Sequence, residues 1–147
     1  MTSTLYKHIL VATDLAENCS LLMARAANIA QLTKASMSVA HVLPHSLVPY
    51  AGEFSIPIDA EIEATIKKQA KKQLASLGKK HHIDTESQYL LEGSVKVEIT
   101  ELAKKIHADL IVVGTHSHTG IEILLGSQAN AILHAAQCDV WVIRIKR

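Results

Sequence analysis

The sequence predicts an α/β, Rossmann-like fold: a single doubly wound sheet of five parallel strands, in the order 3-2-1-4-5, with helices on both faces. Short aliphatic runs without polar alternation recur along the chain, which is typical of strands buried on both sides. Longer amphipathic segments separate these runs, and this alternation indicates parallel strands joined by right-handed helical crossovers. The chain has 147 residues, 48% of them hydrophobic, so we expect one domain over residues 1–147.

The first half of the chain supplies two strands, a helix and a loop. Residues 8–13 (HILVAT) and 36–44 (SMSVAHVLP) predict the first two strands, and alanine-rich residues 18–32 between them have helical spacing. From Pro44 to Pro57 the chain contains three prolines and a glycine with little periodicity. This composition predicts a long loop.

A second helix is expected after that loop, with Asp59 as its N-cap and Gly78 at its end. Its buried face is predicted from one apolar stripe: Ile62, Ile66, Ala70, Leu74 and Leu77. Four lysines lie mostly off this stripe, at positions 67, 68, 71 and 72. We expect them to form a solvated helix face rather than a binding patch.

The second half continues the alternation of strands and helices. Strands are predicted at 84–93, 109–114 and 139–146, and helices at 94–108 and 127–137. Ser94 suits the N-cap of the first of these helices. In the predicted strand order, the first and fourth strands flank the point where the winding reverses, and a doubly wound sheet binds ligands at the carboxyl ends of such strands.

Composition excludes several classes of function. A formal charge of +1 and an aromatic content of 3% give no polyanion-binding surface and no stacking platform, so no nucleic-acid partner is expected. No apolar segment approaches membrane-spanning length and no signal peptide is recognisable, so we expect a cytoplasmic protein without a membrane partner. Cys19 and Cys138 are expected to be reduced, buried thiols, although the sequence does not exclude a disulfide.

The stretch GTHSHTGIEILLGSQ, residues 114–128, has the parts of an anion site. A strand precedes it, glycines let a ligand approach the main chain, and Gly126 with Ser127 opens a helix whose first N–H groups suit a phosphate. It contains no lysine and no GxxxxGK[ST] motif, which disfavours fast phosphoryl transfer. The first strand is followed by ATDLAEN rather than GxGxxG, which disfavours a dinucleotide dehydrogenase.

Metal and catalytic interpretations find little support in the residues. His116, His118 and His134 follow no recognised ligand spacing, so no metal site is expected, and His41 within its aliphatic run suits a core histidine. Asp14 could serve as a general base, hydrogen-bond ribose or adenine, or cap the loop that follows the first strand. Since the sequence places no base beside Ser127 or Cys138, no catalytic residue is assigned.

The chain resembles the universal stress protein family. The resemblance covers nearly the whole length, through YKHILVATDLAENC, SVAHVL and, most specifically, the final third that begins DLIVVGTHSHTG. Nucleotide-binding members share an approximate G-x2-G-x9-G-[ST] motif, often with a spacer one residue shorter. Here Gly114 stands at the first glycine, Ser117 at the second, and Gly126 with Ser127 at the last, with the shorter spacer.

The resemblance implies a set of nucleotide-binding residues. Ala12, Thr13 and Asp14 would face adenine and ribose, and the backbone of Val42 would meet the adenine edge. Gly114 and Thr115 would border the ribose and α-phosphate. The phosphates would be lined by Ser117, Gly126, Ser127 and Gln128.

The resemblance also implies a function. We expect a stress-response protein that binds ATP or AMP, with or without Mg²⁺, as a sensor or regulator, and that forms a homodimer through its last strand. A slow ATP hydrolase or nucleotidyl-transfer enzyme, and a dimeric interaction scaffold with an empty pocket, are the alternatives. The sequence alone separates these three only weakly.

Overall fold

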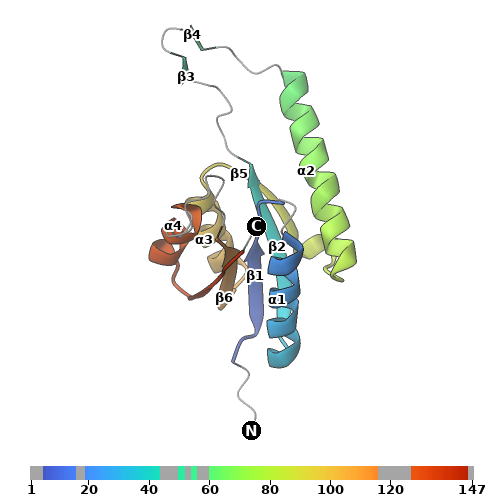
Figure 1. Cartoon of the computed structure of the whole chain (residues 1–147), viewed down its shortest axis with the longest axis vertical. Helices are drawn as coiled ribbons and strands as arrows, with labels where there is room; N and C mark the ends of the chain where they lie inside the picture. Colours follow the sequence, from blue (N-terminus) through green and yellow to red (C-terminus); the bar gives the residue numbers. More distant parts are fainter. Residues whose placement is uncertain are drawn as a thin grey trace.

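The computed structural model describes residues 5–15, 19–43, 50–51, 54–55, 60–115 and 127–145 (Figure 1). The order of its elements repeats the predicted alternation of strands and helices. The strands are β1 (His8–Ala12), β2 (Ser36–Leu43), β3 (Tyr50–Ala51), β4 (Phe54–Ser55), β5 (Gln88–Glu92), β6 (Leu110–Gly114) and β7 (Asp139–Ile143). The helices are α1 (Cys19–Thr33), α2 (Ala60–Lys80), α3 (Val95–Lys105) and α4 (Ser127–Ala135), with a short 3₁₀ turn at Thr85–Ser87.

The main sheet has the predicted topology. Its five strands lie in the order β5-β2-β1-β6-β7, which is 3-2-1-4-5 when these strands are numbered along the chain. All four pairings are parallel, and β1 lies at the centre between β2 and β6. The reversal of winding therefore falls between β1 and β6, as the sequence predicts.

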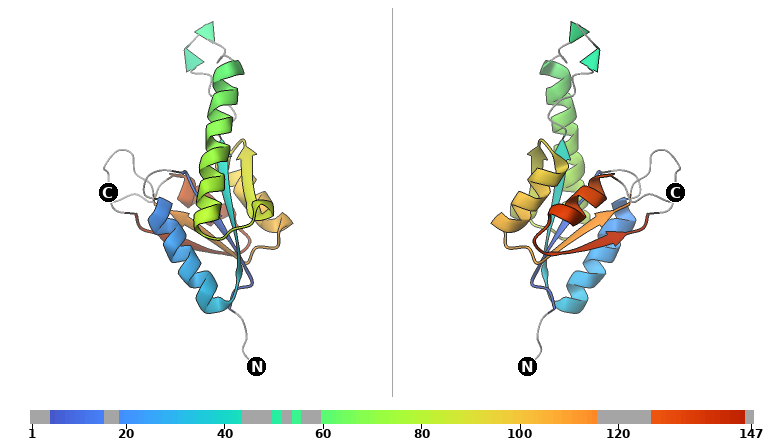
Figure 2. Two further views of the ribbon diagram at one scale, coloured as in Figure 1. Left: turned by 90° about the vertical axis from the view of Figure 1, so that its right-hand side faces the viewer. Right: turned by 90° about the vertical axis from the view of Figure 1, so that its left-hand side faces the viewer.

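Each face of the sheet has its own core, as the alternation of strand side chains requires. On one face, Ile9, Val11, Val39 and Val112 pack with α1 and the second half of α2. On the other, Leu10, Ala40, Ile111 and Val113 pack with α3 and α4. Figures 1 and 2 show the same two layers of helices on opposite sides of the strands. The cores are almost wholly aliphatic, which fits the low aromatic content.

The amino-terminal edge of the sheet is fixed by side chains. The carboxylate of Asp109 accepts hydrogen bonds from the backbone N–H groups of Lys7 (2.8 Å) and His8 (3.0 Å). The His8 ring lies 3.1 Å from the carbonyl of Ile106 and 2.7 Å from the hydroxyl of the buried Ser38. Since a carbonyl only accepts, Nδ1 of His8 carries a proton and donates to Ile106 O, and in a neutral ring Nε2 would accept from Ser38. These contacts tie β1 to β2 and β6 at the end opposite the candidate site.

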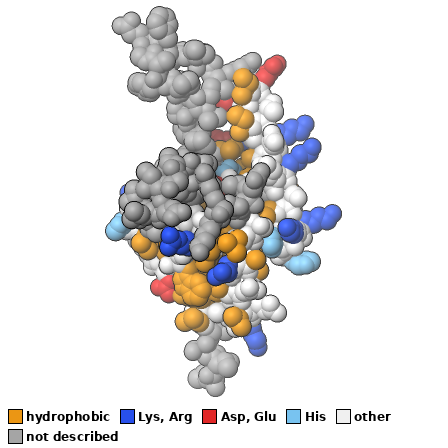
Figure 3. Space-filling view, viewed as in Figure 1, with side chains coloured by type: hydrophobic (Ala, Val, Ile, Leu, Met, Phe, Trp, Pro, Cys, Tyr) orange, Lys and Arg blue, Asp and Glu red, His pale blue; other side chains and the backbone are white. Residues whose placement is uncertain are grey.

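Only the second half of α2 packs on the sheet, which corrects the predicted stripe. Ala70, Leu74 and Leu77 are buried, but Ile62 and Ile66 are 53% and 37% exposed. In Figures 1 and 2 the first turns of α2 extend beyond the ends of the strands, so these isoleucines have no sheet beneath them. The lysines at 67, 68, 71 and 72 are exposed, and Figure 3 shows Lys and Arg side chains along the side of the molecule that α2 forms.

The expected end of α2 at Gly78 is wrong, because the helix continues to Lys80. It ends in a Schellman motif: Ile83 N donates to Gly78 O (2.7 Å), His82 N lies 3.4 Å from Lys79 O, and His82 has a φ of 58°. α1 and α3 end in the same way, with Lys34 (φ 59°) and His107 (φ 57°) in the left-handed position. Residues other than glycine therefore occupy the left-handed position, where glycine is most favourable.

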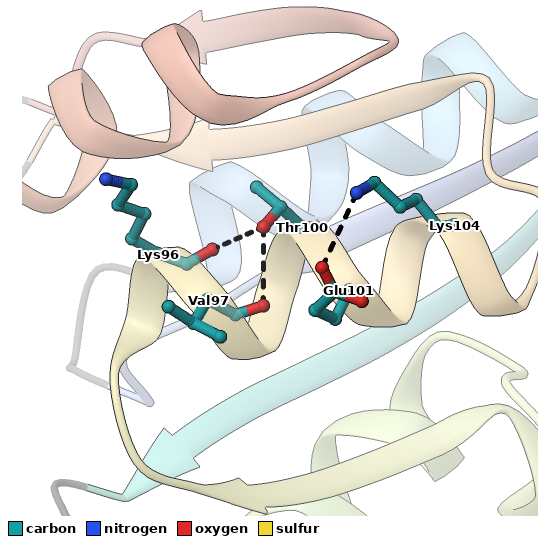
Figure 4. Close-up of polar contacts among 5 residues, drawn as sticks. All are labelled: Lys96, Val97, Thr100, Glu101 and Lys104. Carbon is teal, nitrogen blue, oxygen red and sulfur yellow. Dashed lines mark hydrogen bonds and ion pairs between the residues drawn. The ribbon is translucent and has the colours of Figure 1, made fainter.

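α3 begins at the predicted cap, with Ser94 Oγ accepting from Val97 N at 3.4 Å. Within the helix, the buried hydroxyl of Thr100 donates to the carbonyl of Lys96 at 2.8 Å and lies 3.3 Å from that of Val97 (Figure 4). This local bond satisfies a polar group on the packed side of the helix. Lys104 forms an exposed ion pair with Glu101 at 3.4 Å.

The segment predicted as a loop contains a small antiparallel pair that the sequence does not reveal. β3 and β4 pair through Tyr50 with Ser55 and Ala51 with Phe54, away from the main sheet (Figure 1). The rest of the Pro44–Pro57 segment, and the proposed cap Asp59, lie outside the described residues. Among the helices described, none has the length and apolar character needed to cross a bilayer.

Candidate functional site

The candidate site lies where β1 leaves the sheet. Ala12 is the last residue of β1 and pairs with Ala40 of β2 on one side and Val113 of β6 on the other. Thr13 makes one more ladder bond, from its N–H to Ala40 O at 2.9 Å, and the chain then turns towards α1. Because β2 and β6 both extend past this point, to Leu43 and Gly114, the departure of β1 leaves the last residues of its two neighbours without β1 as a strand partner, and this place is called the opening beside β1.

The turn after β1 is held by local hydrogen bonds. Thr13 is 6% exposed, and its hydroxyl accepts from Leu15 N at 3.0 Å. Its carbonyl lies 2.8 Å from Nδ1 of His41, so this nitrogen carries the proton and donates. Leu15 has a φ of 60°, a left-handed conformation that few bulky residues adopt. Asp14, at the centre of the turn, is exposed.

Val42 brings its backbone to the opening left by β1. In a parallel sheet, alternate residues of a strand direct both backbone polar groups to the same neighbouring strand. Because Ala40 O accepts from Thr13 N, Ala40 faces β1, and Val42, two residues further on, faces the same way. The side chain of Val42 is 6% exposed and packs in the core that α3 and α4 cover. Val42 therefore presents backbone, rather than side chain, to the opening.

Gly114 and Thr115, on the other side of β1, are engaged by the C-terminal segment. A Cβ built on Gly114 would lie 2.4 Å from Cδ1 of Ile145, so the glycine makes room for that side chain. Thr115 N donates to Ile143 O at 2.9 Å, and the Thr115 hydroxyl accepts from Ile145 N at 3.0 Å. The structure thus gives both residues a role in fastening the C-terminal segment to β6.

The predicted phosphate-lining residues are described only in part. Ser117 and Gly126 lie outside the described residues, as do His116 and His118. Ser127 begins α4, which confirms the predicted start of this helix, and Gln128 in its first turn is exposed. Ala129 packs in the same core as Val42 and Val113. This contact places the first turn of α4 on the same face of the sheet as Val42.

Both cysteines are free and partly buried, which agrees with reduced thiols. Burial, and secondarily the negative charge of Asp14, raises the pKa of the Cys19 thiol. Burial together with Asp139 and Asp109 raises the pKa of the Cys138 thiol. Thiols with raised pKa values hold little thiolate at neutral pH and make poor nucleophiles or metal ligands. Over the residues that can be described, no cluster of three or more His, Cys, Asp or Glu could hold a metal ion.

His41, which the sequence predicts to be a core histidine, has a different environment in the structure. It is only partly buried, and its ring donates a hydrogen bond to Thr13 O in the turn after β1. The largely apolar pattern of residues 36–43 does not show where the neighbouring strand ends. The only sequence signal is the position of His41 near the end of a strand that lies beside the departing β1.

The comparison with known proteins identifies the family. A family model described as the universal stress protein family matches residues 5–144. Universal stress protein A homolog 1 of Coxiella burnetii is 49% identical over 141 residues, which cover 96% of this chain and 98% of that protein. The chain therefore belongs to the universal stress protein family, which confirms the resemblance seen in its sequence.

Solved structures support the same fold. The hypothetical protein MJ0577 superposes with a TM-score of 0.77 at 22% identity, over 97% of this chain and 98% of the other. A universal stress protein solved in complex with cAMP superposes with a TM-score of 0.58 at 24% identity, over 94% of this chain and 96% of the other. At these identities the likeness shows the Rossmann-like fold alone.

Proposed function

We propose that this chain is a cytoplasmic stress-response protein that binds an adenine nucleotide, ATP or AMP, with or without Mg²⁺. The ligand would lie where β1 leaves the sheet, and the whole of residues 1–147 would act as one nucleotide-sensing domain. The single observation that supports the proposal is that β1 leaves the sheet at the switch point, next to Val42 of β2 and with Asp14 in the turn that follows.

The chemistry of the opening suits a nucleoside. Ala12 would be an apolar neighbour for a base, and backbone groups of Val42 could hydrogen-bond its edge. The Asp14 carboxylate would accept from ribose hydroxyls, whereas close to phosphates it would repel them. The phosphates would extend past Gly114 and Thr115 towards Ser117, Gly126, Ser127 and Gln128. A universal stress protein of this fold has been solved in complex with cAMP, which supports an adenine nucleotide as the class of ligand.

A regulatory role is favoured over fast catalysis. The glycine-rich stretch has no lysine to stabilise a transferring phosphoryl group. The exposed carboxylate of Asp14 could still act as a general base, which is the observation that keeps a slow ATP hydrolase or nucleotidyl-transfer enzyme as the second candidate. A dimeric scaffold with an empty pocket is the third.

Assembly as a homodimer through β7 belongs to the same proposal. β7 is an edge strand of the sheet, and four successive residues from Val140 to Ile143 are apolar. Trp141 is 40% exposed on this strand and contacts Tyr6 edge-on, with ring centroids 6.3 Å apart. An uncovered apolar edge strand invites pairing with another chain, and two-fold symmetry would satisfy both copies at once.

One variant separates binding from catalysis. If Asp14 binds the nucleoside, Asp14→Ala should weaken ATP and AMP by similar factors, each by about 1–3 kcal/mol for a lost charged hydrogen bond. If it is a general base, single-turnover hydrolysis should collapse while both affinities hold. Calorimetry with the two nucleotides and a single-turnover assay on this variant distinguish the two functions. Intact affinity with abolished hydrolysis would replace the sensor by the enzyme, and a wild-type chain that binds neither nucleotide would favour the scaffold.

A further inference from the structure

In the turn after β1, the two groups that would pair with the backbone of Val42 in a continuing strand make other hydrogen bonds. If β1 continued in register beyond Ala12, residue 14 would lie opposite residue 42. In that ladder Val42 N would donate to Thr13 O, and Val42 O would accept from Leu15 N. Both of those partners are present in the described turn. Neither is joined to Val42 there, because each makes a different hydrogen bond.

The carbonyl of Thr13 is taken by the side chain of His41. Nδ1 of His41 donates over 2.8 Å to Thr13 O, the acceptor that a continuing ladder would give to Val42 N, and among the described residues no hydrogen bond joins Val42 N to Thr13 O. The side chain of His41 can do this because Val39 and His41 share the α1 and α2 face of β2, the opposite side from Val42. The ring thus bonds the Thr13 carbonyl from that face of β2.

The N–H of Leu15 is taken by the hydroxyl of Thr13, which accepts it at 3.0 Å. The left-handed φ of 60° at Leu15 accompanies this bond and turns the chain towards α1. Two local hydrogen bonds, one from His41 and one to Thr13, therefore remove both strand partners of Val42. Within the part of the chain that the structure describes, the N–H donor and the C=O acceptor of Val42 on this side of β2 have no other partner.

We propose that His41 is a positioning residue that keeps the Val42 backbone edge available for the ligand. The ligand edge that fits is one with an acceptor beside a donor, as in N1 and the 6-amino group of adenine. This inference rests on the proposed function and adds a residue to it: His41 does not touch the base but holds Thr13 so that Val42 can. Guanine presents a donor at N1 beside an acceptor at O6, the reverse of adenine, so the same edge would disfavour it.

A matched pair of variants tests the hydrogen bond apart from the shape of the ring. His41→Asn keeps an N–H donor bonded to Cγ, as Nδ1 is, whereas His41→Leu has nearly the same shape as Asn and no donor. We expect His41→Asn to keep ATP and AMP affinity within about threefold of wild type. His41→Leu should weaken both by about tenfold, the scale of one lost hydrogen bond. Thermal melts of both variants establish that they fold.

Hydrogen–deuterium exchange of the Val42 amide is a measurement that a change in side-chain packing alone would not alter. In the nucleotide-free wild type this amide should exchange rapidly with solvent deuterium, because its strand partner is diverted. In His41→Leu the released carbonyl of Thr13 can accept from Val42 N, so exchange should slow by about tenfold or more. His41→Asn should exchange like the wild type. Residue-resolved NMR of the full chain measures all three.

The possible results separate the two proposals. If the wild type binds adenine nucleotides but His41→Leu binds them equally well, or both variants lose affinity equally, the positioning role is wrong while the binding function stands. If Val42 exchange is the same in wild type and His41→Leu, the diversion of the carbonyl is wrong. If the wild type binds no adenine nucleotide and exchange still slows in His41→Leu, the proposed function fails and the arrangement at Val42 is supported.

Discussion

Gly114 offers the most detailed test of the relation between the fold and the site. Family resemblance gives it a place beside the ribose and α-phosphate, whereas the structure places Ile145 over it. A Cβ at position 114 would lie 2.4 Å from Cδ1 of Ile145 and 3.2 Å from its Cγ1, but 3.8 Å from the nearest backbone atom, Ile143 O. The conflict in Gly114→Ala is therefore with the end of one side chain, and mainly with one methyl group.

The magnitude follows from that geometry. Overpacking a core usually costs about 1–3 kcal/mol, and the lower half of this range applies because Ile145 is only partly buried and can move. We expect Gly114→Ala to lower the free energy of unfolding by about 1–1.5 kcal/mol. Ile145→Val removes Cδ1 alone and should cost about 0.5 kcal/mol at this partly buried position. In the double variant the clash is largely gone, so adding Gly114→Ala to Ile145→Val should cost less than about 0.5 kcal/mol.

The assay is urea unfolding of the four proteins, followed by the fluorescence of the chain's single tryptophan, Trp141 on β7. A coupling of about 1 kcal/mol between positions 114 and 145 is the expected result. Strictly additive costs would show that Ile145 does not cover Gly114. Nucleotide affinity of the stable double variant then isolates the ligand role: a loss that Ile145→Val does not repair would mean that the ligand itself needs the glycine.

Three other predictions concern assembly and stability. Val142→Lys on the edge strand should shift a dimer towards monomer in sedimentation, because two-fold symmetry brings two like charges into one contact; an unchanged dimer would place the interface elsewhere. His107 has a left-handed backbone at the end of α3, so His107→Gly should raise the free energy of unfolding by about 0.5 kcal/mol and His107→Val should lower it by about 1 kcal/mol. Equal effects of the two variants in urea unfolding would contradict the Schellman motif at the end of α3. Burial, then the hydrogen bond to Asp139, raises the pKa of Tyr6 above 10.0, so the folded state holds this proton where the unfolded state loses it. Stability should fall as the pH rises beyond 10 and fall less in Tyr6→Phe, and parallel pH profiles of the two proteins would exclude this contribution.

The strands and their order could be predicted because buried parallel strands have a recognisable local sequence pattern. HILVAT and DLIVVG are aliphatic without alternation, and the helices between them allow few topologies. The end of α2 could not be predicted in the same way. Gly78 is a plausible helix end in the sequence, but α2 ends at Lys80 with His82 in the left-handed position. The next residue, Ile83, packs in the core, and this long-range contact is not visible in the local sequence.

The candidate site was predictable as a place but not as a set of contacts. The ATD turn and the glycine-rich stretch mark the carboxyl ends of β1 and β6 from the sequence alone. The contact of His41 with Thr13 depends on where β1 leaves the sheet, and the contact of Ile145 with Gly114 joins residues far apart in the chain. Neither a strand pattern nor a motif contains such long-range information, although both contacts lie at the candidate site.

The most direct test of adenine-nucleotide binding is the identity of the small molecule that the purified protein carries. Protein prepared without added nucleotide would be denatured, and the released fraction analysed by mass spectrometry against a buffer blank. We expect an adenine nucleotide, in an amount approaching one per chain or recoverable to that level after incubation with ATP or AMP. Release of no nucleotide, together with failure to take up either one at millimolar concentration, would contradict nucleotide binding as the function of this chain.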